Sequence, residues 1–221
     1  MHQIARRERQ LAPARAQLPA DYGGAVAQRN AALRRVSAGF STREALEPWT
    51  LQVAELGSAL VAARKETLEL LAPGFRERAG ELGLAEAELR YDGEPPSLAA
   101  LEARLDRDLD RGVTGVGPHL DDIVIASGTR DLRSFGSQGE QRLAVLSLLL
   151  AEAELLPTPP LLLLDDVLSE LDLGRREVLA RRLAGMGQTM ITATHRSALP
   201  IEPSQVVEVE HGFARDGTAR S

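Results

Sequence analysis

The stretch Ser134-Phe-Gly-Ser-Gln-Gly-Glu-Gln-Arg142, followed by Leu161-Leu-Leu-Leu-Asp-Asp-Val-Leu-Ser-Glu-Leu-Asp172, decides the fold that this sequence predicts. The first segment is a glycine-containing loop that runs directly into an apolar helix. It therefore offers backbone N–H groups and the positive end of a helix dipole to an anion. The second segment is a short leucine strand that ends in two aspartates. Buried strands that deliver Asp at their carboxyl end are typical of sheets that hold Mg²⁺ beside phosphates.

A regular alternation of helices and strands follows the glycine loop. A helix over about Gly139–Leu155 is apolar on nearly every side, which predicts an interior position. Leu161–Leu164 is expected to form a central parallel strand covered on both faces. An amphipathic helix over Leu173–Leu183 and a β-branched strand over Gln188–Thr194 come next, and Gln205–Glu210 is expected as a last strand. This order predicts the α/β fold class.

Two long helices are expected before this part of the chain. The first covers about Asp21–Ala38 and ends at Gly39. The second begins after Pro48 and is expected to end at Pro73-Gly74, where the proline interrupts the apolar helical period. Two such helices are typical of an antiparallel hairpin or arm. Simple helix packing explains the same pattern, and the residues assign no chemistry to it.

Shorter elements connect these helices to the glycine loop. Glu88–Tyr91 alternates as a short strand does. Ser97 is placed to cap an amphipathic helix that ends at Gly112, with Asp108 expected on its solvent-facing side. The turn that follows contains His119, Asp121 and Asp122. Three ligand types in one turn do not make a metal site, so metal binding is disfavoured there.

The composition limits the classes of function. With 43% hydrophobic and 26% charged residues, the 221-residue chain is an ordinary globular protein of one or two domains. Aromatic residues make up 3% of the chain, which disfavours base stacking as a mode of nucleic-acid binding, and there is no cysteine for disulfides or thiol catalysis. The start has no signal-peptide pattern and no run is long enough to span a membrane, so we expect a cytoplasmic protein without a membrane partner.

Positive charge is concentrated at the start of the chain. The net charge is −6, yet residues 1–44 carry eight arginines against three acidic residues. This balance fits a surface that faces nucleic-acid phosphates. It fits a solvated helix face equally well, and the sequence leaves both possibilities open.

Six stretches, in this order, resemble the RecF family of ABC/SMC-type ATPases, and they cover the chain from about residue 25 onward. The stretches are Arg29–Leu33, Arg107–Gly112, Gly117–Asp122, Asp131–Arg142, Leu161–Asp172 and Thr192–His195. The resemblance implies an α/β fold: an ABC/SMC-type ATPase head without its P-loop lobe, with an antiparallel helical arm. Residues 1–157 are then expected to form the arm and the signature-motif lobe, and residues 158–221 the Walker B, D-loop and switch-histidine part of the sheet.

The glycine loop resembles the family's Ser-x-Gly-x-Gln-Arg signature motif. The match implies that Ser137, Gln138, Gly139 and Gln141 contact the γ-phosphate of ATP held by a second protomer. A hydroxyl, a glycine backbone and a helix start all favour a phosphate anion. A helix cap with a tight turn explains Ser137 and Gly139 as well.

The leucine strand and the residues after it resemble a Walker B motif, a D-loop and a switch histidine. The resemblance implies that Asp165 holds Mg²⁺ and that Asp166 orients or deprotonates the attacking water. The alternative is a pair of helix-capping aspartates after a strand. Ser169 and Asp172 match the D-loop, which would cross the dimer interface, and His195 matches the catalytic switch position that senses the γ-phosphate.

One departure from the family concerns the phosphate-binding loop. A P-loop needs G-x-x-x-x-G-K-[ST], and the only lysine of this chain is Lys65, which has no glycine before it. The family places that loop near its amino terminus. We therefore expect a RecF-type protein that lacks its first part, through truncation or as one half of a split pair, with little or no ATP turnover alone.

The resemblance implies a DNA replication and repair protein of recombination and the SOS response. Such a protein dimerises with ATP on DNA at junctions of single and double strands, with single-stranded DNA and mediators of the RecO/RecR type as partners. Arg29, Arg34 and Arg35 are weaker candidates for DNA contact. The alternatives are a non-hydrolysing interaction fragment and a transport-type ABC subunit. The arm-like helices before the signature motif disfavour the transporter.

Overall fold

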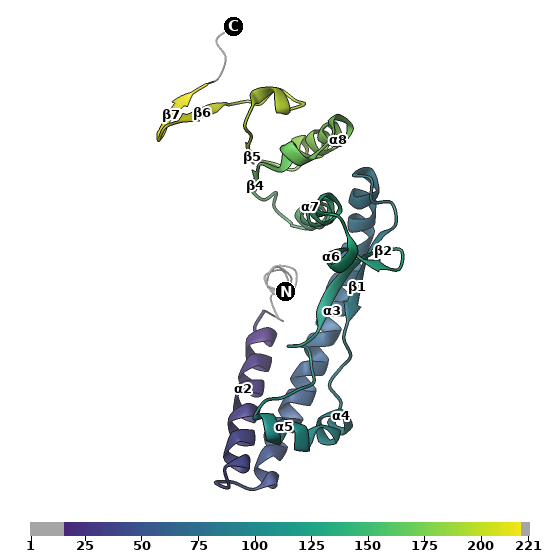
Figure 1. The fold of residues 1–221 in the computed structure, drawn as a ribbon, viewed down its shortest axis with the longest axis vertical. Helices are drawn as coiled ribbons and strands as arrows, with labels where there is room; N and C mark the ends of the chain where they lie inside the picture. Colours follow the sequence, from purple (N-terminus) through teal and green to yellow (C-terminus); the bar gives the residue numbers. More distant parts are fainter. Residues whose placement is uncertain (1–15, 218–221) are drawn as a thin grey trace.

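The computed structural model describes residues 16–217, apart from the side chain of Glu170 (Figure 1). The four arginines before residue 16, which belong to the predicted phosphate-facing surface, lie outside this range. The α-helices are α2 (Leu18–Ser37), α3 (Glu47–Glu81), α4 (Leu98–Ala103), α5 (Leu105–Arg111), α6 (Leu132–Phe135), α7 (Gln138–Glu154) and α8 (Leu173–Ala184). The 3₁₀ turns are η2 (Arg43–Leu46), η3 (Val167–Glu170) and η4 (Arg196–Ala198). The strands are β1 (Ala87–Asp92), β2 (Asp122–Ser127), β3 (Arg130–Asp131), β4 (Leu162–Asp165), β5 (Thr189–Thr192), β6 (Val207–Glu210) and β7 (Phe213–Asp216).

Helices α2 and α3 form the predicted antiparallel arm (Figure 1). Tyr22, Val53 and Leu60 belong to an apolar cluster that joins the two helices, and α4 contributes the fully buried Leu101. Gly39 follows α2 with φ +76°, a left-handed conformation that glycine adopts at low cost and that ends the helix as expected. The arm therefore has its own small core.

Helix α3 continues through Pro73 to Glu81, so the predicted break at Pro73-Gly74 is wrong. A proline inside a helix costs about 3 kcal/mol. Burial offsets this cost, because Phe75 and Ala79 after the proline are both 0% exposed in the main core. A Cβ on Gly74 would lie 3.4 Å from the Ala151 Cβ, which shows how closely α3 packs on α7.

The expected helix from Ser97 to Gly112 is two helices, α4 and α5, that meet at Arg104. Ser97 caps the first, accepting from the Ala100 N–H at 3.1 Å, and Gly112 ends the second with φ +66°. The placement of Asp108 on the wet side is wrong, because this residue is 1% exposed. The Asp108 carboxylate instead accepts a hydrogen bond from Nη1 of Arg29 in α2, at 2.8 Å.

The main core joins α3, α7, α8 and the β4–β5 pair. Its members include Phe75, Leu143, Leu164 and Leu179, so it contains residues from both sides of the predicted boundary at 157/158. The division into domains at that boundary stays a prediction. Helix α7 is mostly buried, as expected for an apolar helix, although Val145 is 46% exposed.

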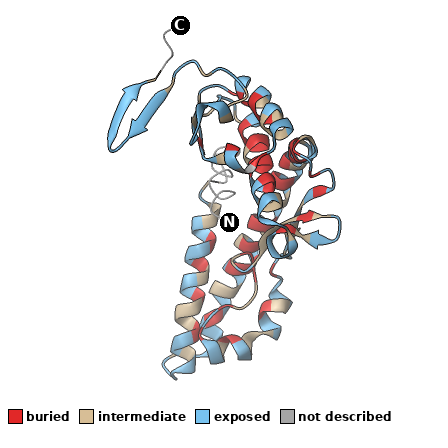
Figure 2. Ribbon diagram, turned by 45° about the horizontal axis from the view of Figure 1, so that its top comes forward, coloured by how far each residue is buried: buried red, intermediate tan, exposed pale blue. Residues whose placement is uncertain are grey.

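The described strands form three small sheets. β1, β2 and β3 form an antiparallel sheet, β4 and β5 pair in parallel, and β6 and β7 form a hairpin that projects from the body with every residue exposed (Figure 2). Leu164 faces the core at 8% exposure, whereas Leu163 is 67% exposed. The expectation of a strand covered on both faces is therefore wrong, since within residues 16–217 β4 pairs with β5 alone. Among the same residues, no helix has the length and apolarity that a membrane crossing requires.

Candidate functional site

The carboxyl end of β4 presents the two predicted acidic residues at the surface. Asp165 and Asp166 are both exposed. Asp165 lies opposite Thr192 in the parallel register of β4 and β5, and the Thr192 hydroxyl donates to Asp165 Oδ1 at 2.5 Å. The same hydroxyl accepts the backbone N–H of Asp166 at 3.0 Å. One threonine thus forms a hydrogen bond with each of the two aspartates. Asp165, Asp166 and Thr192 are called the β4–β5 corner below.

Asp166 has an unusual backbone. Its φ of 47° and ψ of 30° place it in the left-handed helical region, which few residues other than Gly, Asn and Asp occupy. The Ser169 hydroxyl donates to the Asp166 carbonyl at 3.0 Å. Thr192 binds the N–H of Asp166 and Ser169 binds its C=O, so the peptide groups on both sides of this exposed residue have hydrogen-bond partners.

The other predicted residues of this segment lie close by in sequence. Asp172 caps α8, with its Oδ1 accepting the Arg175 N–H at 2.9 Å, so it has the capping role that acidic residues often have. His195 is exposed and begins the η4 turn after β5. Ser169 is also exposed. Their proposed contacts with a nucleotide or across a dimer stay predictions.

The segment Ser134–Arg142, which resembles the signature motif and is called the signature segment below, caps α7 with a reciprocal pair of hydrogen bonds. The Ser137 Oγ accepts the Glu140 N–H at 3.2 Å, and the Glu140 carboxylate accepts the Ser137 N–H at 2.8 Å. This bond from the backbone lowers the pKa of Glu140. The capping alternative is thus real, and the Ser137 hydroxyl, which also bonds the Glu140 carboxylate, adds to the lowering of that pKa.

Gln141 has a more restricted role than the motif implies. Its Nε2 donates to the carbonyl oxygens of Arg133 at 3.1 Å and Gly136 at 3.2 Å. Both amide donors are thereby engaged within the protein, and the side chain offers Oε1, an acceptor, to a ligand. A phosphate needs donors, so the exposed backbone of Gly139, in the first turn of α7, is better placed to bind it than the Gln141 side chain.

The two groups of residues are separate in this chain. Within residues 16–217, the described hydrogen bonds of Ser137 and Gln141 stay in the signature segment and α6, and those of Asp165 and Asp166 stay in the β4–β5 corner. The structure therefore does not join them into one pocket. Both groups are exposed, as the prediction of action across two protomers requires.

The corner suits a magnesium ion by the chemistry of its donors. Magnesium prefers oxygen ligands, and it is commonly bound by one or two carboxylates together with phosphates and water. Asp165 is an exposed carboxylate with one oxygen bonded to Thr192. The second oxygen is the one that would hold the ion.

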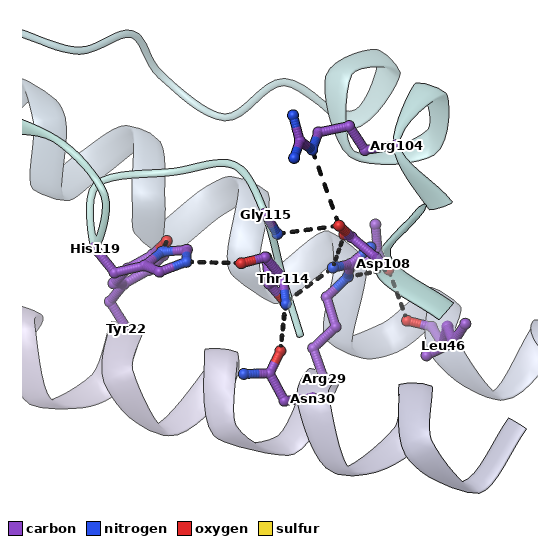
Figure 3. Close-up of polar contacts among 10 residues, drawn as sticks. Tyr22, Arg29, Asn30, Leu46, Arg104, Asp108, Thr114, Gly115 and His119 are labelled. Atoms are coloured by element: carbon purple, nitrogen blue, oxygen red, sulfur yellow. Dashed lines mark hydrogen bonds and ion pairs between the residues drawn. The ribbon is translucent and has the colours of Figure 1, made fainter. Parts of the chain in front are cut away.

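The proposed DNA contact of Arg29 is wrong. Its side chain is 1% exposed and its Nη1 donates to Asp108 Oδ2 at 2.8 Å and to Thr114 Oγ1 at 2.9 Å (Figure 3). A guanidinium enclosed in this way cannot reach a phosphate. Arg34 and Arg35 are exposed, and Arg34 donates to the Gly112 carbonyl at 3.2 Å, so both stay candidates.

The histidine and aspartates of the turn before β2 have protein partners. The His119 Nδ1 lies 2.7 Å from the Tyr22 hydroxyl, and its Nε2 lies 2.9 Å from the Thr114 carbonyl (Figure 3). Asp121 accepts from the Tyr91 hydroxyl at 2.7 Å, and Asp122 pairs with an arginine of α6. Among residues 16–217, no three His, Asp or Glu side chains gather in the way a metal ion requires.

Sequence reasoning missed the role of Thr192. It lay within a matched stretch, but nothing distinguished it from the other threonines of the strand. The signal that could have found it is the parallel register, since the residue opposite a strand-end Asp in the next strand points to the same side. That register becomes visible only when two strands 27 residues apart are aligned.

Comparison with known proteins gives the same kind of relative repeatedly. The chain is 39% identical over 207 residues to the DNA replication and repair protein RecF of Moorella thermoacetica, a match that covers 87% of this chain and 55% of that protein. It is 41% identical over 201 residues to RecF of Geobacter sulfurreducens, covering 82% and 54%. The chain thus spans about half the length of the curated relatives it matches. No family model matches it.

A solved structure supports the same relationship. A structure of the recombination mediator protein RecF-ATP in the RecFOR pathway matches with a TM-score of 0.77 and 26% identity, over 96% of this chain and 62% of that one. The predicted fold class is confirmed, since the arm and the α/β part are both included in the match. By sequence, the chain matches the carboxyl-terminal part of RecF proteins, and by fold it matches the solved RecF structure over both the helical arm and the α/β part.

Proposed function

We propose that this chain supplies the Walker B, D-loop and signature surfaces of a RecF-type ATPase for DNA replication and repair. The observation that carries the proposal is the exposed β4–β5 corner, where Asp165 and Asp166 leave the sheet in fixed orientations. The similarity to RecF proteins over more than four fifths of the chain supports it.

The residues of the corner have distinct roles in this proposal. Asp165 holds a magnesium ion, which supplies charge neutralisation on the phosphates when it is bound. Asp166 accepts a hydrogen bond from the attacking water and orients it. His195, which follows β5, lies on the segment from which it would contact the γ-phosphate.

The signature segment acts on the nucleotide of a second protomer. The N–H groups at the start of α7 donate to the phosphate oxygens, and the helix dipole favours the negative charge. The proposal includes an ATP-dependent homodimer, and it is supported by the exposure of the signature segment and of the Asp165–Asp166 corner on the same chain. The D-loop residues Ser169 and Asp172 would lie at that interface.

DNA is the proposed macromolecular partner, at junctions of single and double strands, together with mediators of the RecO/RecR type. The proposal rests on relatives that are named DNA replication and repair proteins and on the RecFOR pathway of the solved structure. The exposed Arg34 and Arg35, near the end of α2, are the candidates for phosphate contact.

A second candidate function is a non-hydrolysing interaction fragment of such an ATPase. It is favoured by the position of Lys65, the lysine that a P-loop would need. Lys65 lies in the interior of α3 and not at the start of a helix. Its Nζ is 3.8 Å from Glu94 and 5.9 Å from the centre of the Tyr91 ring. This lysine is therefore not placed as the lysine of a P-loop is, next to a glycine loop at the start of a helix.

ATP turnover by the chain, alone and mixed with a separately produced RecF amino-terminal polypeptide that carries a P-loop, tests the two candidates. We expect negligible turnover alone and restored turnover in the mixture, abolished by Asp165→Asn. Robust hydrolysis by the pure chain would show that it holds phosphates without a P-loop. A mixture that binds firmly but never hydrolyses ATP would favour the interaction fragment.

A further inference from the structure

The hydroxyl of Thr192 has both of its hydrogen-bonding roles fixed. A carboxylate can only accept and an amide N–H can only donate, so the proton of Thr192 Oγ1 must point to Asp165 and its lone pair to Asp166. At 2.5 Å, the bond to Asp165 has the length of a charge-assisted O–H···O⁻ bond. The hydroxyl fills both roles from a single atom, and an aliphatic side chain such as valine can fill neither.

This arrangement selects which carboxylate oxygen remains available. Thr192 engages Oδ1 of Asp165, which leaves Oδ2 as the oxygen that this bond does not occupy. It also fixes the peptide before Asp166, a residue held in a left-handed conformation that side chains other than those of Asn and Asp rarely tolerate. One threonine therefore determines the direction of both aspartates.

The location of these bonds argues against a purely structural role. Asp165, Asp166 and Thr192 are all exposed, and hydrogen bonds between exposed groups add little to the stability of a fold, because water replaces them. Thr189, on the same strand, provides a contrast: its Oγ1 is buried and has no partner. The strand thus carries one threonine whose hydroxyl is unused and one whose hydroxyl organises the corner.

We propose that Thr192 is a positioning residue, which orients Asp165 toward a divalent cation and Asp166 toward the attacking water. This inference rests on the proposed function for the roles of the two aspartates. The geometry of the corner itself is independent of that function. The hydroxyl is the essential feature, so serine can replace Thr192 and valine cannot.

Three variants test this inference. Thr192→Val keeps the shape and removes the hydroxyl, Thr192→Ser keeps the hydroxyl, and Thr189→Val makes the matched change at a hydroxyl without a partner. The first measurement is amide hydrogen exchange of Asp166 in the chain by nuclear magnetic resonance. We expect exchange about fivefold faster in Thr192→Val and unchanged in the other two variants. Unchanged exchange in Thr192→Val would overturn the inference.

The second measurement is titration with Mn²⁺ alone, followed by electron paramagnetic resonance. We expect binding about fivefold weaker in Thr192→Val, unchanged in Thr192→Ser and Thr189→Val, and lost in Asp165→Asn. If Asp165→Asn weakens binding but Thr192→Val does not, the positioning role fails while the proposed function stands. If the unmodified chain binds no Mn²⁺ and Asp166 exchange still responds to Thr192→Val, the proposed cation role of Asp165 fails and Thr192 is confirmed as the residue that fixes the corner.

Discussion

Arg29 and Asp108 form an ion pair of 2.8 Å inside the arm, with side chains 1% and 2% exposed. The pair joins α2 to α5, and both partners have further bonds: Arg29 to Thr114, and Asp108 to the Gly115 N–H at 3.1 Å. A buried charge is tolerated only when it is paired and hydrogen-bonded in this way. The arm therefore depends on a polar contact that hydrophobic patterning cannot reveal.

Removing one partner of this pair leaves an uncompensated buried charge. We expect Arg29→Ala to lower the free energy of unfolding by about 3–5 kcal/mol, measured by urea denaturation. The matched control is Arg35→Ala on the exposed face of the same helix, which should change it by less than about 0.5 kcal/mol. Equal effects of the two substitutions would show that the buried pair has no special weight.

DNA binding is expected to depend on the exposed end of α2. Arg34→Glu combined with Arg35→Glu should weaken DNA affinity and reduce the slope of log affinity against log salt by about 2. Arg76→Glu, at an exposed position of α3, serves as the charge control. Fluorescence anisotropy over a salt series measures both quantities. A double variant that binds as tightly as the unmodified chain, with the same slope, would show that Arg34 and Arg35 do not contact DNA.

The two tyrosines of the chain should titrate abnormally. Burial, assisted by the hydrogen bond to Asp121, raises the pKa of Tyr91 to about 12. Burial and the nearby negative charge of Asp121 also raise the pKa of Tyr22. Because the folded pKa values exceed the unfolded ones, the neutral tyrosines contribute stability below about pH 10, and this stability is lost as the pH rises toward 12.

An absorbance titration of tyrosinate checks this pH dependence. In the folded chain both tyrosines should ionise above pH 10, and in denaturant near pH 10. Tyr91→Phe should remove one of the two transitions, and Asp121→Asn should lower the pKa of Tyr91. A titration that is identical in the folded and unfolded chains would contradict the enclosure of these rings.

Two glycines in the arm should respond oppositely to alanine. A Cβ on Gly57 would lie 2.5 Å from Pro96 Cγ, whereas a Cβ on Gly24 meets nothing within 4 Å. We expect Gly57→Ala to destabilise the chain by about 1–3 kcal/mol through overpacking. Gly24→Ala should stabilise it by about 0.5–1 kcal/mol, because alanine favours the helix. Thermal unfolding of both variants measures the contrast. A change in unfolding temperature of the same sign in both variants would contradict the close contact at Pro96.

The sequence predicted those features that depend on local chemistry. The cap at Ser137, the strand that ends at Asp165 and the stop at Gly39 all follow from residues within one or two turns of each other. The α/β order after the glycine loop was also predictable, because the hydrophobic periods there are strong.

The features that were missed depend on contacts between distant segments. Helix α3 passes Pro73 because α7 covers the residues beyond it, and Asp108 is buried because Arg29, 79 residues away, meets it. The exposed face of β4 has a similar origin, since the number of strands beside it is not encoded in the strand itself. Tertiary contacts overrode local preference in each case.

Helix α3 has one further consequence. Its 35 residues make a rod about 50 Å long, with its first half packed on α2 and its last turns packed on α7 and tied by Glu81 to Arg182 of α8. Because it is one continuous helix in contact with both regions, α3 couples the arm to α8. A change in the tilt of the arm would therefore act on the Glu81–Arg182 contact, about 50 Å from the start of the helix.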